Sequence, residues 1–200
     1  MNIGPKYLAA RRTAARSTMP GLPAALLIAA LAVMLFPATA RSHPQTRDGF
    51  YIGLGMASGS AAVDFGGNND DRETGYAGSF RFGWTVNPKF ALGLESNSWV
   101  KVNDEAAASI GSVTVAGSFF PAEGLVLRGG LGGGYLGEAD EGLGGSGGFA
   151  YSLGATYEFR VLRTLAIGPQ IDYTHVSLEN DASANFYNFG LALNWYFIPK

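Results

Sequence analysis

The chain has no cysteine among its 200 residues, and charged residues make up only 15% of it. Without cysteine it can form neither a disulfide framework nor a thiolate active site. It also has no basic stripe of the kind that nucleic-acid binding needs. After residue 40, ten basic residues stand against sixteen acidic ones, a net charge of −6, so we expect no nucleic-acid partner.

Long apolar runs are absent after residue 40 as well. No stretch there is apolar over the roughly 18 to 20 residues that a transmembrane helix requires, which excludes a helical membrane protein. Histidine is scarce too, since the chain has only His43 and His175. We find no metal-ligating cluster in the predicted strands and expect no cofactor.

The first 40 residues have the features of a cleaved secretory signal peptide. A basic segment with Lys6, Arg11, Arg12 and Arg16 precedes an apolar run at 24–36, and Ala38-Thr39-Ala40 forms a small-x-small cleavage site. The apolar run is too short for the alternative, a membrane anchor helix. Arg11-Arg12 matches a twin-arginine signal only weakly, so the sequence favours general secretion.

Alternation of large apolar and small polar residues dominates the rest of the chain. In the last segment the apolar face consists of Tyr187, Phe189, Leu191, Leu193, Trp195 and Phe197. The opposite face carries Asn, Gly and Ala in place of charges. A soluble half-buried strand would carry charges there, whereas a narrow transmembrane barrel has lipid outside and a tightly filled interior.

Eight such segments are separated by turn signals. They span 49–58, 74–86, 90–101, 110–120, 124–137, 147–160, 164–178 and 185–197. In the fourth, Ile110 and Val113 differ in parity, which suggests a bulge near Gly111-Ser112. The pattern predicts an all-β protein, a monomeric eight-stranded antiparallel up-and-down transmembrane β-barrel. We therefore divide the chain into a signal peptide (1–40), a short N-terminal tail (41–48), the barrel (49–197) and a C-terminal tail (198–200).

The connections alternate between two kinds. Three are tight, at 87–89, 121–123 and 161–163. Four are longer and acidic, and they contain Asp64, Asp70, Asp71 and Glu73, then Asp104 and Glu105, then Glu138, Asp140 and Glu141, then Glu179 and Asp181. Outer-membrane barrels have short periplasmic turns and longer outer loops, so we expect the acidic loops outside and both termini in the periplasm.

Aromatic residues cluster near both ends of the strands, as in interfacial girdles. The predicted turn-side girdle consists of Trp84, Phe90, Phe119, Tyr157, Phe159, Trp195 and Phe197. The predicted loop-side girdle consists of Tyr76, Trp99, Tyr135, Phe149, Tyr173 and Tyr187.

The few strand charges fall on the small-residue face: Arg81, Glu95, Arg128, Glu158 and Asp172. A soluble lipocalin-like barrel is the alternative, but its exterior would need many more charges. If the small-residue face lines the lumen, the five residues form a lumenal charge network that closes a large pore. A three-residue loop at 87–89 would place Arg81 opposite Glu95, with Arg128 as the alternative partner of Glu95.

At the family level the chain resembles the small bacterial outer-membrane β-barrels, the OmpA-transmembrane-domain-like "porin family" proteins. The likeness lies in the runs that start at Gly49, Gly75, Phe90 and Gly129 and in the closing strand, and it covers residues 49–197. It implies fold well and function poorly, because the family has no catalytic motif. The peptidoglycan-binding domain of full-length OmpA is absent from this sequence, so wall anchoring is not implied.

The closing strand also resembles the C-terminal recognition signal of outer-membrane proteins. The matching residues are Asn188, Gly190, Leu193, Trp195 and Phe197. The tail Ile198-Pro199-Lys200 departs from the pattern, which usually stops at the final aromatic residue. The resemblance implies the outer-membrane assembly machinery as a partner.

Two sites carry possible chemistry. His175 and Ser177 share a face, and their spacing is similar to the His-x-Ser of the lipid A deacylase PagL. Leu178, however, stands where the PagL-like Asn is expected. The acid that would orient the histidine also has no clear match in the sequence. The run 68–71 (Asn-Asn-Asp-Asp) has the composition of a calcium loop but lacks its spaced ligands. A solvated loop is favoured there, with cation bridging to lipopolysaccharide phosphates as the other interpretation.

We therefore expect a non-catalytic protein of the cell outer membrane, exported by a cleaved signal peptide, with a structural or surface-interaction role. The expected surroundings are outer-membrane lipid and lipopolysaccharide, with any surface ligand unidentified. The alternatives are a lipid A 3-O-deacylase that uses His175 and Ser177, and a narrow pore or OmpW-like path for small molecules.

Overall fold

The computed structural model describes residues 49–65, 68–69, 72–102, 107–138, 146–178 and 182–197. The predicted signal peptide and both predicted tails lie outside these residues. Within them, no helix is long and apolar enough to cross a membrane.

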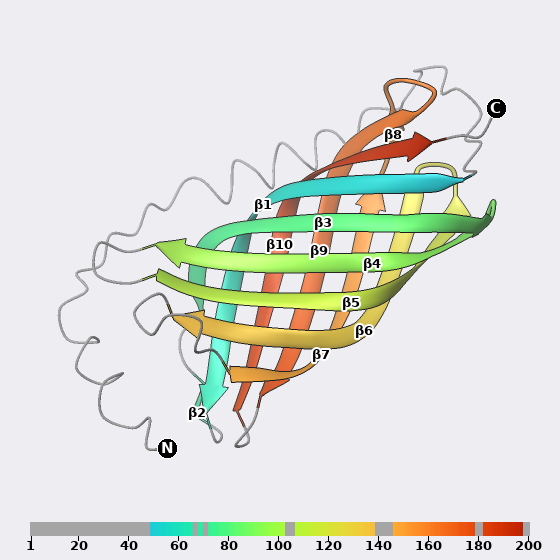
Figure 1. Cartoon of the computed structure of the whole chain (residues 1–200). Coiled ribbons are helices and arrows are strands. Elements are labelled where there is room, and N and C mark those ends of the chain that lie inside the picture. The colour runs from blue at the N-terminus through green and yellow to red at the C-terminus, as the bar shows by residue number, and fades with distance from the viewer. Residues whose placement is uncertain are drawn as a thin grey trace. The chain divides into compact units, whose positions relative to one another are not determined.

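Eight long strands form a closed antiparallel barrel, which confirms the predicted fold (Figure 1). Their bounds are β1 Phe50–Phe65, β3 Glu73–Asn87, β4 Phe90–Val102, β5 Ala107–Ala122, β6 Leu125–Glu138, β7 Ser146–Tyr157, β9 Leu165–Leu178 and β10 Ala182–Phe197. Each pairs with the next long strand, and β10 closes the ring by pairing with both β9 and β1. Two short strands, β2 (Asn68–Asn69) and β8 (Phe159–Arg160), pair with β1 and β9.

The apolar face of each strand points outward. Among the described residues, 28 large apolar side chains are exposed, whereas Asn97, Gln170 and Asp172 are almost fully buried. Soluble proteins rarely expose apolar patches larger than a few hundred Å². The soluble barrel with an apolar interior is therefore excluded, and the pattern is that of a barrel surrounded by lipid.

The β3–β4 hairpin has the register that the sequence predicted, but its turn differs from the predicted three-residue loop. Arg81 pairs with Glu95 across the two strands. The turn itself contains only Pro88 and Lys89, and Asn87 pairs with Phe90. A shift between Thr85 and Asn87 restores the register, so a bulge replaces the expected three-residue loop.

Some strand ends and one predicted bulge also differ from the sequence interpretation. β1 continues to Phe65 and β3 begins at Glu73, so Asp64 and Glu73, assigned to the first loop, belong to strands. The pairing of β5 is continuous through Gly111 and Ser112, so the bulge predicted there is wrong.

The other differences concern the second tight turn and the predicted sixth strand. The second tight turn lies at Glu123 and Gly124, and Gly124 has a φ of +79°, a conformation that side chains disfavour. The predicted sixth strand is divided into β7 and β8, which keep the same register along β9. Pro169 lies opposite this break, and proline has no N–H to donate to a ladder.

All three tight turns lie at the end of the barrel where β1 begins and β10 ends. Phe50 pairs with Phe197 at this end, and Phe65 pairs with Ala182 at the other. We call them the turn side and the loop side. Asp70, Asp71, Asp104, Glu105, Asp140, Glu141, Glu179 and Asp181, which were assigned to the loops, lie outside the described residues.

Candidate functional site

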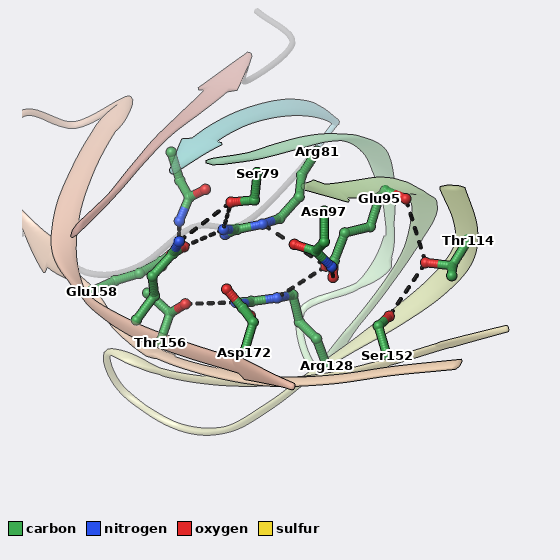
Figure 2. Close-up of polar contacts among 12 residues, drawn as sticks. Ser79, Arg81, Glu95, Asn97, Thr114, Arg128, Ser152, Thr156, Glu158 and Asp172 are labelled. Atoms are coloured by element: carbon green, nitrogen blue, oxygen red, sulfur yellow. Dashed lines mark hydrogen bonds and ion pairs between the residues drawn. The ribbon is translucent and has the colours of Figure 1, made fainter. Parts of the chain in front are cut away.

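The lumen holds a compact group of charged side chains that point toward one another (Figure 2). Arg81, Glu95, Arg128 and Asp172 come from four different strands, β3, β4, β6 and β9, and each is at least nine-tenths buried. Their alternation with outward-facing apolar neighbours is what directs them inward. Burial makes each charge costly unless it is paired, so their mutual positions matter.

Arg128 is the centre of this group. Its Nε lies 3.2 Å from Oε2 of Glu95, and its NH2 lies 2.5 Å from Oδ1 of Asp172. Its NH1 donates a hydrogen bond of 2.6 Å to Oγ1 of Thr156. One guanidinium thus contacts two carboxylates and one hydroxyl group.

Arg81 takes a second position around the same carboxylate. Its Nε lies 3.8 Å from Oε2 of Glu95, and its NH2 donates to Ser79 Oγ at 2.7 Å and to Gln170 Oε1. The direct cross-strand neighbour is therefore the more distant of the two arginines, and Arg128, the alternative partner, makes the shorter contact. Asn97 donates to the other oxygen of Glu95 at 2.6 Å.

Glu158 is the fifth charged residue of the lumen, and it is also buried. Its Oε1 accepts hydrogen bonds from Asn194 Nδ2 at 2.8 Å and from the Tyr196 hydroxyl at 2.6 Å. It is part of the wall of a cavity of about 10 Å³ that also touches Arg81 and Arg128. Such a cavity holds about one water molecule.

Two apolar layers lie above and below the charges. The loop-side layer consists of Ala61, Trp99, Ile110, Ala150, Val176, Ala184 and Phe186. The turn-side layer consists of Tyr51, Ala91, Phe120, Val126, Ala166 and Tyr196. The described residues of the barrel interior thus form an ion-paired layer between two apolar layers.

Sequence reasoning missed the loop-side layer. Trp99, assigned to the outer girdle, is only 2% exposed and lies in the lumen. Ile110 also points inward, which explains why its parity differs from that of Val113. The sequence could have indicated this layer, because Trp99 and Phe186 stand at the alternate strand positions that otherwise carry small or polar residues. The other predicted girdle residues do lie on the outward face of their strands.

His175 and Ser177 lie together on the outward face of β9. Oγ of Ser177 is 3.4 Å from Nε2 of His175, and the imidazole packs against Tyr151 with ring centres 5.1 Å apart. No carboxylate of the described residues contacts His175, and its cross-strand neighbour on β10 is Asn185. Among the described residues, the pair therefore has a nucleophile and a base within reach but no acid to orient a catalytic histidine. Glu179 and Asp181 of the following loop lie outside those residues.

The residues of the predicted C-terminal signal alternate across the barrel wall. Asn188 is buried in the lumen, whereas Leu193, Trp195 and Phe197 are exposed outside. Gly190 lies against the backbone of Met56 and Ala57 on β1, where a side chain would not fit. Their role in assembly stays a prediction.

No group of three His, Asp or Glu side chains within the described ranges could hold a metal ion. Asp70 and Asp71 of the possible calcium loop lie outside those ranges. Asn68 and Asn69 form the short strand β2.

Comparisons with known proteins identify the fold. No family model and no curated protein matches the chain. Among solved structures, Neisserial surface protein A superposes with a TM-score of 0.54 at 12% identity, covering 75% of this chain and 98% of that one. Ail, the attachment invasion locus protein of Yersinia pestis, in complex with the heparin analogue sucrose octasulfate, gives 0.51 at 15% identity, covering 74% and 99%. At these identities the likeness shows the fold alone, that of the small outer-membrane β-barrels.

Proposed function

We propose that the chain is a non-catalytic protein of the bacterial outer membrane that acts as a structural or surface-interaction barrel. The single observation that carries this proposal is the distribution of residue types, with apolar side chains outside and an ion-paired, filled lumen inside. A filled lumen leaves the outer surface and the loops as the places where the protein can interact. Export by the signal peptide at 1–40 and function as a monomer belong to the same proposal.

The neighbours support a surface role by analogy. Ail has been crystallised with a heparin analogue, a polyanionic ligand bound by that protein. For this chain we propose an interaction of the same general kind, through the loop side of the barrel, with outer-membrane lipopolysaccharide or an external ligand. The residues of the C-terminal signal would direct the chain to the assembly machinery.

Conductance tests the closed lumen. We expect the purified protein in a planar bilayer to show no stable conductance of porin magnitude, because two apolar layers flank the charge network and eight-stranded barrels have interiors that side chains fill. Small, gated openings are compatible with the proposal, since ion pairs can rearrange. A stable large conductance would show instead that the chain is a pore.

A second candidate function rests on the contact of 3.4 Å between Ser177 and His175. In that case the chain would hydrolyse an acyl ester of an outer-leaflet lipid, with Ser177 as nucleophile and His175 as base. Mass spectrometry of lipid A from cells that express the parent chain or Ser177→Ala distinguishes the two functions. We expect identical spectra, and loss of an acyl chain only with the parent would identify an enzyme.

A further inference from the structure

Arg72 occupies an unusual position on the outer wall of the barrel, next to the loop side. Its Nε donates to Ser60 Oγ at 3.3 Å, and its NH2 donates to the Ser60 carbonyl oxygen at 2.6 Å. Its NH1 donates to Asn185 Oδ1 at 2.7 Å. Since Ser60 and Asn185 have outward parity on β1 and β10, these bonds hold the guanidinium against the membrane-facing side of the wall.

A row of three tyrosines continues from this guanidinium around the wall. Cζ of Arg72 lies 4.6 Å from the ring centre of Tyr187. The Tyr187 and Tyr173 rings are 4.8 Å apart, and those of Tyr173 and Tyr151 are 6.0 Å apart. We call Tyr151, Tyr173 and Tyr187 the tyrosine row.

The tyrosine row marks a change of polarity on the wall. Toward the turn side, the next outward pair after Tyr173 and Tyr187 is Ile171 and Phe189. Toward the loop side, the next pairs are His175 with Asn185 and Ser177 with Ser183. Amphipathic tyrosines at such a boundary lie at the level of lipid headgroups.

Arg72 has no carboxylate partner in the part of the chain that the structure describes. By contrast, Lys101 at the same end pairs with Glu73 at 2.6 Å, and Arg81 and Arg128 pair inside the lumen. A guanidinium has five N–H donors, and the three bonds named above use three of them. One N–H on NH1 and one on NH2 are left to bind phosphate oxygens, which guanidinium groups often bind through two N–H groups at once.

We infer that Arg72 and the tyrosine row bind the phosphate of an outer-leaflet lipid headgroup. The bonds to Ser60 and Asn185 and the ring of Tyr187 hold the guanidinium in place before the lipid arrives, so little side-chain entropy is lost on binding. The guanidinium, which has no carboxylate partner among the described residues, supplies the attraction, and the tyrosine row places it at headgroup depth. This inference rests on the proposed outer-membrane location.

A titration of the refolded protein in a nonionic detergent that carries no phosphate tests the inference. The probes are lipid A with its phosphates, the same lipid after their enzymatic removal, and inorganic phosphate, and the binding of each is measured by isothermal titration calorimetry. We expect the phosphorylated lipid to bind at least about tenfold more tightly than the dephosphorylated one, the effect of one charge-assisted hydrogen bond. Arg72→Gln should abolish this difference.

The matched control is Arg163→Gln, which removes the same charge from an exposed residue at the turn side and should bind like the parent. Arg72→Lys keeps the charge but not the fork, and it should bind the phosphorylated lipid more weakly than the parent does. This comparison stands even if the glutamine variant fails to refold.

Three results would overturn the inference. One is equal binding by Arg72→Gln and the parent. Another is Arg72-dependent binding of inorganic phosphate as tight as that of the lipid, which would identify a site for free phosphate. The third is loss of lipid binding in EDTA, which would assign the contact to a divalent cation bridge. Because the assay contains no bilayer, the outer-membrane location is judged separately, by cell fractionation.

Discussion

Glu95 contacts both arginines of the lumen. Its Oε2 lies 3.2 Å from Arg128 and 3.8 Å from Arg81, and its Oε1 accepts the amide of Asn97. A buried ion pair adds little net stability when complete, because desolvation offsets the attraction. Removal of one member is different, since the remaining charge stays in the lumen without compensation.

The replacement Glu95→Gln should therefore destabilise the barrel clearly. It keeps the shape of the side chain but removes the carboxylate that contacts both buried guanidinium groups. We expect a loss of about 3 to 5 kcal/mol in the free energy of unfolding. The measurement is a urea titration of the refolded protein, followed by tryptophan fluorescence.

Glu73→Gln is the matched control for this experiment. Glu73 also forms an ion pair, with Lys101, but its side chain is 52% exposed. Exposed pairs contribute at most about 1 kcal/mol. A Glu95→Gln barrel no less stable than Glu73→Gln would mean that Glu95 is hydrated, and the ion-paired lumen would lose its main support.

At the scale of the strand, glycine positions differ in what surrounds them. A Cβ at Gly117 on β5 would point outward and meet nothing within 4 Å. A Cβ at Gly168 on β9 would point inward, onto the carbonyl oxygen of Tyr157. Gly168 is thus required by the close approach of two backbones opposite the β7–β8 break, and Gly117 is not.

Alanine at these two positions should have opposite effects. Gly117→Ala reduces the freedom of the unfolded chain at no steric cost and should raise stability by about 0.5 to 1 kcal/mol. Gly168→Ala forces the strands apart and should lower it by about 1 to 3 kcal/mol. The same urea titration measures both changes. Equal effects on stability would contradict the close approach of the β9 backbone at Gly168 to the backbone at Tyr157.

Strand existence could be predicted from the sequence because lipid outside and a narrow lumen inside demand different side chains at every second residue. The β3–β4 register followed as well, since a slip of one residue would turn Arg81 toward lipid. Strand ends were less predictable. Near the loop side the inward face becomes apolar too, as at Ala61 and Ile110, and alternation between large and small residues fades.

The candidate site was only partly accessible to the same reasoning. The alternation of residues along the strands predicted that the five charged side chains face the lumen. It could not predict that Arg128 lies nearer to Glu95 than Arg81 does, because that depends on how far the side chains extend across the barrel. Arg72 escaped notice because it precedes β3 in an acidic loop. Its bonds to Ser60 and Asn185 join residues far apart in sequence.

At the scale of the whole molecule, the barrel is asymmetric along its axis. The three short connections and both ends of the described barrel lie at the turn side. Arg72 and the strand ends next to the longer acidic segments of the sequence lie at the loop side. Short turns on the periplasmic side and longer loops outside are the rule for outer-membrane barrels.

This orientation predicts which insertions reach the cell exterior. An epitope placed between Asn69 and Asp70 should be labelled by antibody on intact cells, because β2 lies at the loop side. An epitope placed between Pro88 and Lys89 should be labelled only after the outer membrane is permeabilised, because that turn lies beside the termini. Labelling of both after permeabilisation controls for expression and folding. Labelling of intact cells at the Pro88 insertion, with none at Asn69, would show that the barrel has the opposite orientation. Arg72 would then lie away from the outer leaflet. The experiment therefore tests the phosphate site as directly as it tests the topology.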